Sequence, residues 1–336
     1  NATLDCRRFN RRWSAYIERL LPPGEVEAAP LSSDAPHVWI RACPGLAGRE
    51  VCFFAAYEPN GQLAGFKEAY LARLRKAGLF VVLILAVDDI AVQPLESCES
   101  ADAILLRENR GYDFGSWAAA IDGVPSVWEA RLLVLANDSV FGPSASFEKT
   151  LGWIRESKAD VIGLTESLEH GSHLQSYFLA LKGKALGSPE LRKRLTGIRS
   201  LNEKWHVILE YEVKFTSFCR SLGLESRALF PYDEGCRPAP GEIRNPGHFR
   251  WKELLAKGCP FVKVELLCRN PEALDLDGWE EVLLANGFDR YLVRQQIPET
   301  MSLVQERSLQ PINCFTSCRN LRRIEEEGFQ WEAQSD

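Results

Sequence analysis

Residues 51–89, VCFFAAYEPNGQLAGFKEAYLARLRKAGLFVVLILAVDD, hold the pattern that decides the fold. Two apolar stretches of strand length, 51–57 and 80–87, lie on either side of a segment with helical spacing, 63–76, which ends at Gly78. The apolar stretches are nearly continuous rather than alternating, which is typical of strands buried on both faces. Residues 51–89 therefore predict a strand-helix-strand unit of a parallel sheet.

The same alternation continues along the chain. Further strand-length runs lie at 101–106, 131–136, 160–165 and 173–181, and helical patterns at 116–121, 146–157, 189–195 and 205–223. This order predicts an α/β fold with a mostly parallel central sheet flanked by helices. We expect one domain over 46–271, with helical additions at both ends. The N-terminal helical extension, 1–45, contains an arginine-rich amphipathic helix at 7–21, and the C-terminal helical extension covers 272–336.

Composition narrows the class of protein. The chain has 336 residues and a net charge of −6, so charge alone predicts no nucleic-acid partner. No segment reaches the roughly 18 apolar residues that a membrane-spanning helix needs. The ten cysteines form no CxxC pair, which indicates reduced thiols in a cytoplasmic protein. The chain begins with Asn and Met301 is its one methionine, so we expect a domain of a longer polypeptide.

Polar residues follow four consecutive predicted strands. They are Tyr57-Glu58, Asp88-Asp89, Glu108-Asn109-Arg110 and Asn137-Asp138-Ser139. The carboxyl ends of parallel strands share one edge of a sheet, where α/β proteins bind their ligands. We therefore expect these side chains to line a single crevice.

The order of these polar groups resembles the GT-A glycosyltransferase pattern. In that pattern an acid follows the second strand, an Asn/Gly segment follows the third, and an Asp-x-Asp motif that holds a divalent cation follows the fourth. Here the last motif is degenerate, because Asn137-Asp138-Ser139 has one carboxylate. The resemblance implies a Mg or Mn ion held by Asp138 and His248 on the donor diphosphate, and the missing acid puts metal dependence in question.

Longer motifs are similar to those of the rhamnan-synthesis F protein family, which are bacterial glycosyltransferases of cell-surface polysaccharide assembly. They are NRGYDFGSW (109–117), LVLANDSVFGP (133–143), DVIGLTES (160–167), HLQSYF (173–178), YEV (211–213), NPGHFRWKELLAKGCPFVK (245–263) and ELLCRNP (265–271). The resemblance covers roughly residues 50–271. It implies a GT-A-like fold, a nucleotide-diphosphate donor that carries rhamnose or a related sugar, and a lipid-linked or polysaccharide acceptor such as O-antigen.

The resemblance also implies roles for individual residues. An inverting transferase needs a base for the acceptor hydroxyl, and Glu212 is the candidate because its Tyr-Glu-Val context matches the family, whereas that of Glu210 need not. Candidate substrate-binding residues are Tyr57, Asp88, Asp89, Asn109, Arg110, Gly111, Tyr112, Asp113, Asn137, Asp138, His173, Gln175 and Lys263. Asp113 faces the pocket or caps the next helix, and His173 and Gln175 contact substrate or pack beneath it. These alternatives stay open at the level of sequence.

Two other functions fit the same residues. One is transfer of a different sugar such as N-acetylglucosamine, and the other is a non-catalytic glycan-binding or scaffold domain, favoured by the degenerate Asp138 motif. For an enzyme of this family we expect a location at the inner face of the cytoplasmic membrane, with other transferase domains of the same chain or complex as partners.

Overall fold

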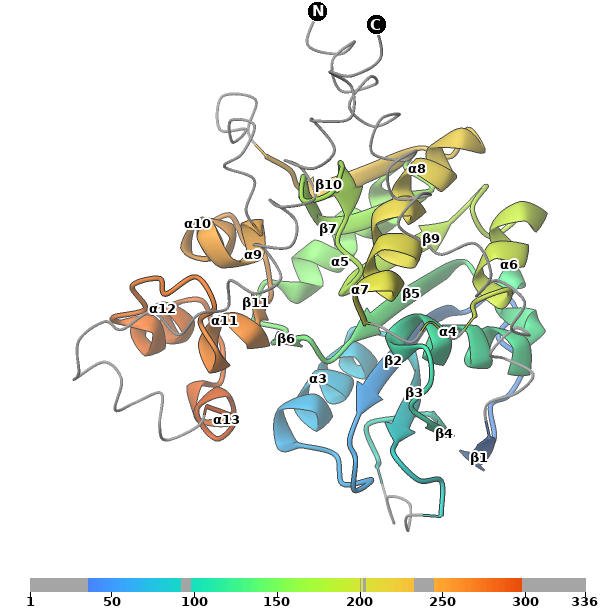
Figure 1. The fold of residues 1–336 in the computed structure, drawn as a ribbon, viewed down its shortest axis with the longest axis horizontal. Helices are drawn as coiled ribbons and strands as arrows, with labels where there is room; N and C mark the ends of the chain where they lie inside the picture. The colour runs from blue at the N-terminus through green and yellow to red at the C-terminus, as the bar shows by residue number, and fades with distance from the viewer. Residues whose placement is uncertain (1–35, 92–97, 200, 202–203, 233–244, 298–336) are drawn as a thin grey trace, which may run out of the picture.

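The computed structural model describes residues 36–91, 98–199, 201, 204–232 and 245–297 (Figure 1). The arginine-rich helix predicted at 7–21 and the end of the C-terminal extension, 298–336, lie outside the described residues. Among the residues described, no helix combines the length and the apolar character needed to cross a bilayer.

Eleven strands form two sheets within the described ranges. They are β1 (His37–Arg41), β2 (Glu50–Tyr57), β3 (Phe80–Val87), β4 (Ala103–Glu108), β5 (Leu132–Asn137), β6 (Val140–Phe141), β7 (Val161–Ser167), β8 (His173–Leu174), β9 (Phe178–Lys182), β10 (Ser226–Phe230) and β11 (Val262–Lys263). The large sheet has the order β1-β4-β3-β2-β5-β9-β7-β10, with β8 paired to β7, and β11 pairs with β6 in a small second sheet. Strands β4, β3, β2, β5, β7 and β10 are parallel, whereas β1, β8 and β9 run antiparallel to their neighbours.

Helices cover both faces of this sheet. They are α3 (Gly65–Lys76), α4 (Tyr112–Gly123), the 3₁₀ helix η2 (Pro125–Glu129), α5 (Phe147–Glu156), α6 (Pro189–Thr196), α7 (Lys204–Val207), the π-helical segment η3 (Ile208–Val213), α8 (Lys214–Ser221), α9 (Pro246–Phe249), α10 (Trp251–Ala256), α11 (Val264–Cys268), α12 (Trp279–Ala285) and α13 (Arg290–Arg294). Figure 1 shows α10 to α13, in orange, gathered at one side of the sheet.

The side chains of β2 show why the strand sequences are continuously apolar. Val51 and Phe53 point to the face covered by α4, where they join one core with Trp117. Cys52 and Phe54 point to the opposite face and join a second core with residues of α3 and α5. A strand between two cores has no solvent-facing side, so neither set of alternate positions is polar. The predicted class is confirmed: a mixed α/β fold with a mostly parallel central sheet flanked by helices, compatible with a GT-A-like fold.

The structure differs from the predicted elements in several places: β10 lies where no strand was predicted, and the helix predicted at 205–223 is divided into α7, η3 and α8. The strand predicted at 173–181 divides into β8 and β9, because residues 175–177 leave the strand path to form the hydrogen bonds described below. The helix predicted from residue 116 begins at Tyr112. The expected domain boundary after residue 45 leaves out β1, which extends the sheet by pairing antiparallel with β4.

Candidate active site

The chain reverses its direction across the sheet at β2. Strand β3 lies on one side of β2 and β5 on the other, so their carboxyl ends form a topological switch point, the usual ligand site of an open α/β sheet. The backbone N–H of Tyr57, at the end of β2, donates to Asp138 Oδ2 at 3.0 Å, just beyond the end of β5. The expectation that polar groups from separate strand ends meet here therefore agrees with the geometry.

Lys67 of α3 ties these strand ends together. Its side chain is buried, with 7% of the residue exposed. The ammonium group lies 2.5 Å from Asp138 Oδ2 and 2.9 Å from Glu58 Oε1, and it donates to the carbonyl oxygen of Tyr57 at 2.8 Å. Burial works against the charge, but the carboxylates of Asp138 and Glu58 outweigh it and raise the pKa of Lys67. Three acceptors account for all three ammonium hydrogens.

Two tyrosine rings stand exposed at this edge. Tyr57 is 40% exposed and its hydroxyl donates to Asp88 Oδ1 at 2.7 Å, a hydrogen bond that raises the pKa of the Tyr57 phenol. Tyr112 is 36% exposed. Asp89 accepts the backbone N–H of Ala91 at 2.9 Å, so its described hydrogen bond closes a local turn. Tyr57, Asp88 and Tyr112 are thus the groups that a planar base or a ribose could reach.

The segment after β4 is held from below by Arg107. That side chain is fully buried, donates to Ser116 Oγ at 2.9 Å and to the carbonyl oxygen of Arg110 at 2.7 Å, and forms no ion pair with any described residue. Burial lowers the pKa of Arg107 to about 10. Arg110 itself pairs with Glu108 at 2.8 Å, and Asn109 is fixed by its backbone N–H, which donates to Val87.

Gly111 and Tyr112 turn the chain into α4 with φ values of 72° and 54°. A positive φ is costly for tyrosine and points to a functional constraint. Gly111 is the N-cap of α4, so the alternative that Asp113 caps this helix is wrong. Asp113 Oδ2 instead accepts Asn137 Nδ2 at 2.7 Å, and Asn137 Oδ1 accepts the N–H and hydroxyl of Ser139. Asp113 and Asn137 therefore join the same edge.

A second group of residues lies beside the first. Asn137 N–H donates to the carbonyl oxygen of Tyr177, and Val264 N–H donates to that of Ser139. These bonds hold the end of β5 beside the segment of Tyr177, which follows His173 and Gln175, and beside β11, which carries Lys263.

Glu212 and Glu210 have different surroundings. Glu212 Oε1 accepts the backbone N–H of Ser176 at 3.1 Å and lies 4.0 Å from His173 Nε2. Glu210 pairs with Arg194 at 3.3 Å and with Lys214 at 2.5 Å. Both glutamates belong to η3, and π-helical turns inside α-helices are frequent at functional sites. The geometry favours Glu212 over Glu210 as the carboxylate that faces the polar edge, by which we mean the carboxyl ends of β2, β3, β4 and β5 with the polar residues that follow them.

The region around Glu212 is held in place by three further candidates, Gln175, His173 and Lys263. Gln175 is buried; its Oε1 accepts Thr165 Oγ1 at 2.8 Å and its Nε2 donates to Asn245 Oδ1 at 3.2 Å, so the packing interpretation suits it better than substrate contact. His173 is also buried, and its Nδ1 bonds the carbonyl oxygen of Gly171 at 2.8 Å. The ammonium of Lys263 lies 4.5 Å from the ring centre of Tyr177.

His248 of α9 is oriented by an acid. It is 3% exposed, and its Nδ1 lies 2.8 Å from Glu272 Oε1. Its Nε2 is buried and has no partner among the described residues. A carboxylate that fixes one ring nitrogen and leaves the other free is the arrangement found around metal-bound histidines.

Comparison with known proteins decides the family. Rhamnan synthesis protein F matches residues 81–316, which is more than half of the chain. The chain belongs to the rhamnan synthesis protein F family.

Two relatives extend this likeness. Virulence protein VirA of Vibrio anguillarum is 24% identical over 271 residues, which cover 72% of this chain and 87% of the relative. The uncharacterized protein y4gN of Sinorhizobium fredii is 26% identical over 205 residues, which cover 58% of this chain and 52% of the relative. Family membership indicates a glycosyltransferase-like function in polysaccharide synthesis, with a nucleotide-sugar donor and a polysaccharide acceptor in general terms.

A GT-A-like fold implies a divalent cation, and of its two candidate ligands His248 is suitable and Asp138 is less so. His248 Nε2 is a suitable ligand, because it is buried, free and oriented by Glu272. Asp138 is less suitable, because Lys67 already neutralises its carboxylate. Within the described part of the chain, no three His, Cys, Asp or Glu side chains converge on one point as a metal would require.

Two residues of this site were missed at the level of sequence, Lys67 and Glu169. Arg107 was expected on the donor side at the end of β4, but it is buried beneath the segment that follows. Lys67 looks like an ordinary lysine of an amphipathic helix. Its position in the first turn of a helix that follows β2 is the signal that could have found it, because such a turn starts at the carboxyl edge of the sheet.

Glu169 lies after β7, is half-buried, and has the acidic neighbours Glu272 and Glu212. Burial raises the pKa of Glu169 to about 7, with Glu272 and Glu212 adding to the shift and Lys263 opposing it. In the unfolded chain this carboxyl ionises near the ordinary glutamate pKa of 4.5, whereas in the folded chain it resists ionisation up to about 7. The folded state thus binds the extra proton, and the free energy of unfolding falls as pH rises through this window.

We therefore expect Glu169→Gln to be more stable than the original protein at about pH 8, by on the order of 1–2 kcal/mol, and equally stable at about pH 4. Urea unfolding at the two pH values measures the difference. Glu156→Gln, an exposed glutamate on α5, is the control and should change neither value. Equal stability of Glu169→Gln and the original protein at the higher pH would contradict the prediction.

Proposed function

We propose that this protein transfers rhamnose, or a closely related sugar, from a nucleotide-diphosphate donor to a growing cell-surface polysaccharide, with inversion at the anomeric carbon. The observation that carries the proposal is the convergence of Tyr57, Asp88, Asn137 and Asp138 at the β2/β5 switch point of a chain that belongs to a rhamnan synthesis family. A lipid-linked acceptor would place the reaction at the inner face of the cytoplasmic membrane.

The donor would lie along the polar edge. The exposed ring of Tyr112 suits stacking on the base, and the Tyr57–Asp88 pair suits hydrogen bonds to the ribose. The diphosphate needs positive charge as it leaves, because negative charge develops on it in the transition state. Lys263, whose ammonium group lies over the ring of Tyr177, is the candidate residue that could supply this charge. A divalent cation, if bound at His248 and Asp138, would neutralise the same oxygens.

Glu212 would act as the base. Its Oε1 is fixed by the Ser176 N–H, and its Oε2 has no partner among the described residues. In the proposed step Oε2 takes the proton of an acceptor hydroxyl while that oxygen forms a bond to the anomeric carbon. The bond from the anomeric carbon to the diphosphate breaks at the same time, so the electron pair leaves with the nucleoside diphosphate.

A transfer assay tests the proposal. Purified protein with deoxythymidine-diphospho-rhamnose and a rhamnose oligosaccharide should release the nucleoside diphosphate and lengthen the oligosaccharide by one residue. Activity only with an N-acetylglucosamine donor would keep the transferase and change the sugar. The absence of transfer with every donor, alongside a donor-dependent rise in melting temperature, would favour the binding-domain alternative.

A further inference from the structure

Arg107 is an unusual residue for its position in the sheet. It lies near the end of β4 on the face covered by α4, and the residues of β4 that precede it on that face, Ala103 and Leu105, belong to the apolar core. Arginine is almost never fully buried unless it is paired with an acid. Arg107 is 0% exposed and forms no ion pair with a described residue. A residue that breaks this rule inside a core indicates a role that an apolar side chain could not fill.

The guanidinium group of Arg107 braces the turn between β4 and α4. Nη2 donates to the carbonyl oxygen of Arg110 at 2.7 Å, and Nη1 donates to Ser116 Oγ at 2.9 Å. Between these two acceptors lies the pair Gly111 and Tyr112, with φ values of 72° and 54°. The planar guanidinium holds both acceptors in a fixed relation. It therefore stabilises a left-handed conformation that is costly for tyrosine.

Tyr112 is the side chain that this turn presents. The residue is 36% exposed at the polar edge, and its ring suits stacking on a planar base. Arg107 itself cannot contact a ligand, because its side chain has no exposed surface. It can act on a ligand only through the conformation of the turn that it holds.

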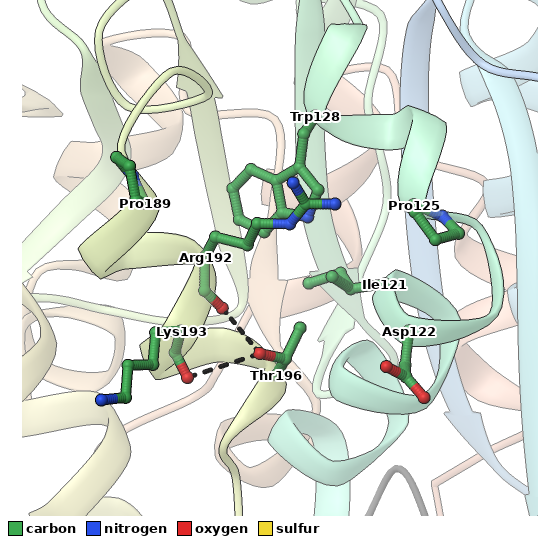
Figure 2. A pocket seen from close by; sticks show the side chains of 8 residues that line it. All are labelled: Ile121, Asp122, Pro125, Trp128, Pro189, Arg192, Lys193 and Thr196. Carbon is green, nitrogen blue, oxygen red and sulfur yellow. Dashed lines mark hydrogen bonds between the residues drawn. The ribbon is translucent and has the colours of Figure 1, made fainter.

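The rest of α4 does not need Arg107. Residues 118–120 are buried in the core on this face of the sheet. At the far end of the helix, Ile121 lines a pocket together with Trp128 of η2 and Arg192 of α6 (Figure 2). Packing thus fixes the body and the far end of α4, whereas the guanidinium of Arg107 fixes the turn that leads into it.

We propose that Arg107 is a positioning residue for nucleotide recognition, which holds Tyr112 in the left-handed conformation that presents its ring to the base of the donor. The proposal rests on the proposed function for the class of ligand, a nucleoside diphosphate. It makes affinity for the base, and not for the diphosphate, depend on Arg107. Inorganic pyrophosphate has no base to stack, so its binding should not depend on the arginine.

Titration calorimetry of the full chain with deoxythymidine diphosphate, and separately with pyrophosphate, tests the proposal. Arg107→Met keeps a long apolar side chain and removes both hydrogen bonds. It should weaken binding of the nucleotide roughly tenfold, which is about what a stack of a base on an aromatic ring contributes, and leave pyrophosphate binding unchanged. Tyr112→Asn removes the ring at a φ that asparagine tolerates, and should have the same effect. Arg192→Met, the same substitution at the far end of α4, is the control and should bind both ligands as the original protein does.

The double variant decides whether Arg107 acts through Tyr112. Arg107→Met combined with Tyr112→Asn should bind deoxythymidine diphosphate about as weakly as either single variant, because the arginine has no ring left to position. A loss of roughly a hundredfold, the product of the two single effects, would overturn the proposal. So would unchanged nucleotide binding by Arg107→Met, or equal weakening of pyrophosphate in that variant.

Ser116→Ala provides the same test if Arg107→Met does not fold. It keeps Arg107, removes one of its two acceptors, and leaves little space because only an oxygen atom is lost. Binding of deoxythymidine diphosphate should weaken roughly threefold, in keeping with the loss of one hydrogen bond, with the melting temperature nearly unchanged. Nucleotide binding equal to that of the original protein would count against the role of Arg107.

Transfer kinetics separate the proposal from the proposed function. In Arg107→Met the KM for the sugar donor should rise by the same factor as the nucleotide affinity falls, while kcat stays unchanged. Nucleotide binding with the expected pattern but no transfer from any donor would overturn the proposed function and leave the positioning role standing. Normal transfer with an unchanged donor KM in Arg107→Met would overturn the positioning role alone.

Discussion

Glu212→Gln should lower the transfer rate roughly 100- to 10,000-fold and leave donor affinity unchanged, because a general base contributes about that much to a reaction. Glutamine can still accept the Ser176 N–H through its amide oxygen, so the loop after β8 keeps its support. It cannot take a proton from the acceptor hydroxyl. Steady-state release of the nucleoside diphosphate measures the rate, and a donor thermal-shift titration measures the affinity.

Glu210→Gln is the matched control for this prediction. Glu210 lies two residues earlier in the same π-helical segment, but it pairs with Arg194 and Lys214 rather than facing the polar edge. Its replacement should cost some stability and leave kcat within about twofold, as expected for a partly exposed ion pair. A large loss of kcat in Glu210→Gln with a small one in Glu212→Gln would reverse the assignment of the base.

Which polar residues lie at the strand ends was easier to predict from sequence than which of these residues contact one another. Tyr57, Asp88 and Asp138 could be placed because apolar strands in series must end at one edge. Which of them touch could not be predicted, because the Tyr57–Asp88 and Asp113–Asn137 bonds depend on side-chain conformations set by packing across separate strands. The same limit applies to His173 and Gln175, whose burial is a consequence of β8 folding back against β7.

Lys67 shows a different limit. A lysine on a helix is usually a solvated residue, and only its place in the first turn after β2 separates Lys67 from Lys76, which lies in the last turn of the same helix. The difference arises from the turn after β2, which brings Glu58 under the start of α3; Glu58 Oε1 accepts the N–H of Ala64, just before that helix. Burial of Lys67 is therefore a tertiary property of the β2–α3 connection.

Lys67→Met should destabilise the fold by on the order of 3 kcal/mol, since removal of one partner from a buried ion pair leaves uncompensated charge. Methionine keeps the apolar stem and removes the ammonium, so the loss comes from the carboxylates of Glu58 and Asp138, which face each other without a cation. The midpoint of thermal unfolding measures the effect, which corresponds to a shift of roughly 4 °C for a chain of 336 residues.

A second substitution separates charge from packing. In Lys67→Met with Asp138→Asn, one of the two unpaired carboxylates is gone, so we expect the double variant to recover part of the stability lost in Lys67→Met alone. Mn²⁺ gives a further test, because Lys67 occupies the Asp138 oxygen that a cation would use. Mn²⁺ should raise the melting temperature of Lys67→Met, by taking the place of the ammonium beside Asp138 and Glu58, and should have a smaller effect on the original protein. If Mn²⁺ instead stabilises the original protein strongly and the single variant only weakly, then Lys67 does not compete with a cation, and the ion binds through His248 and other groups.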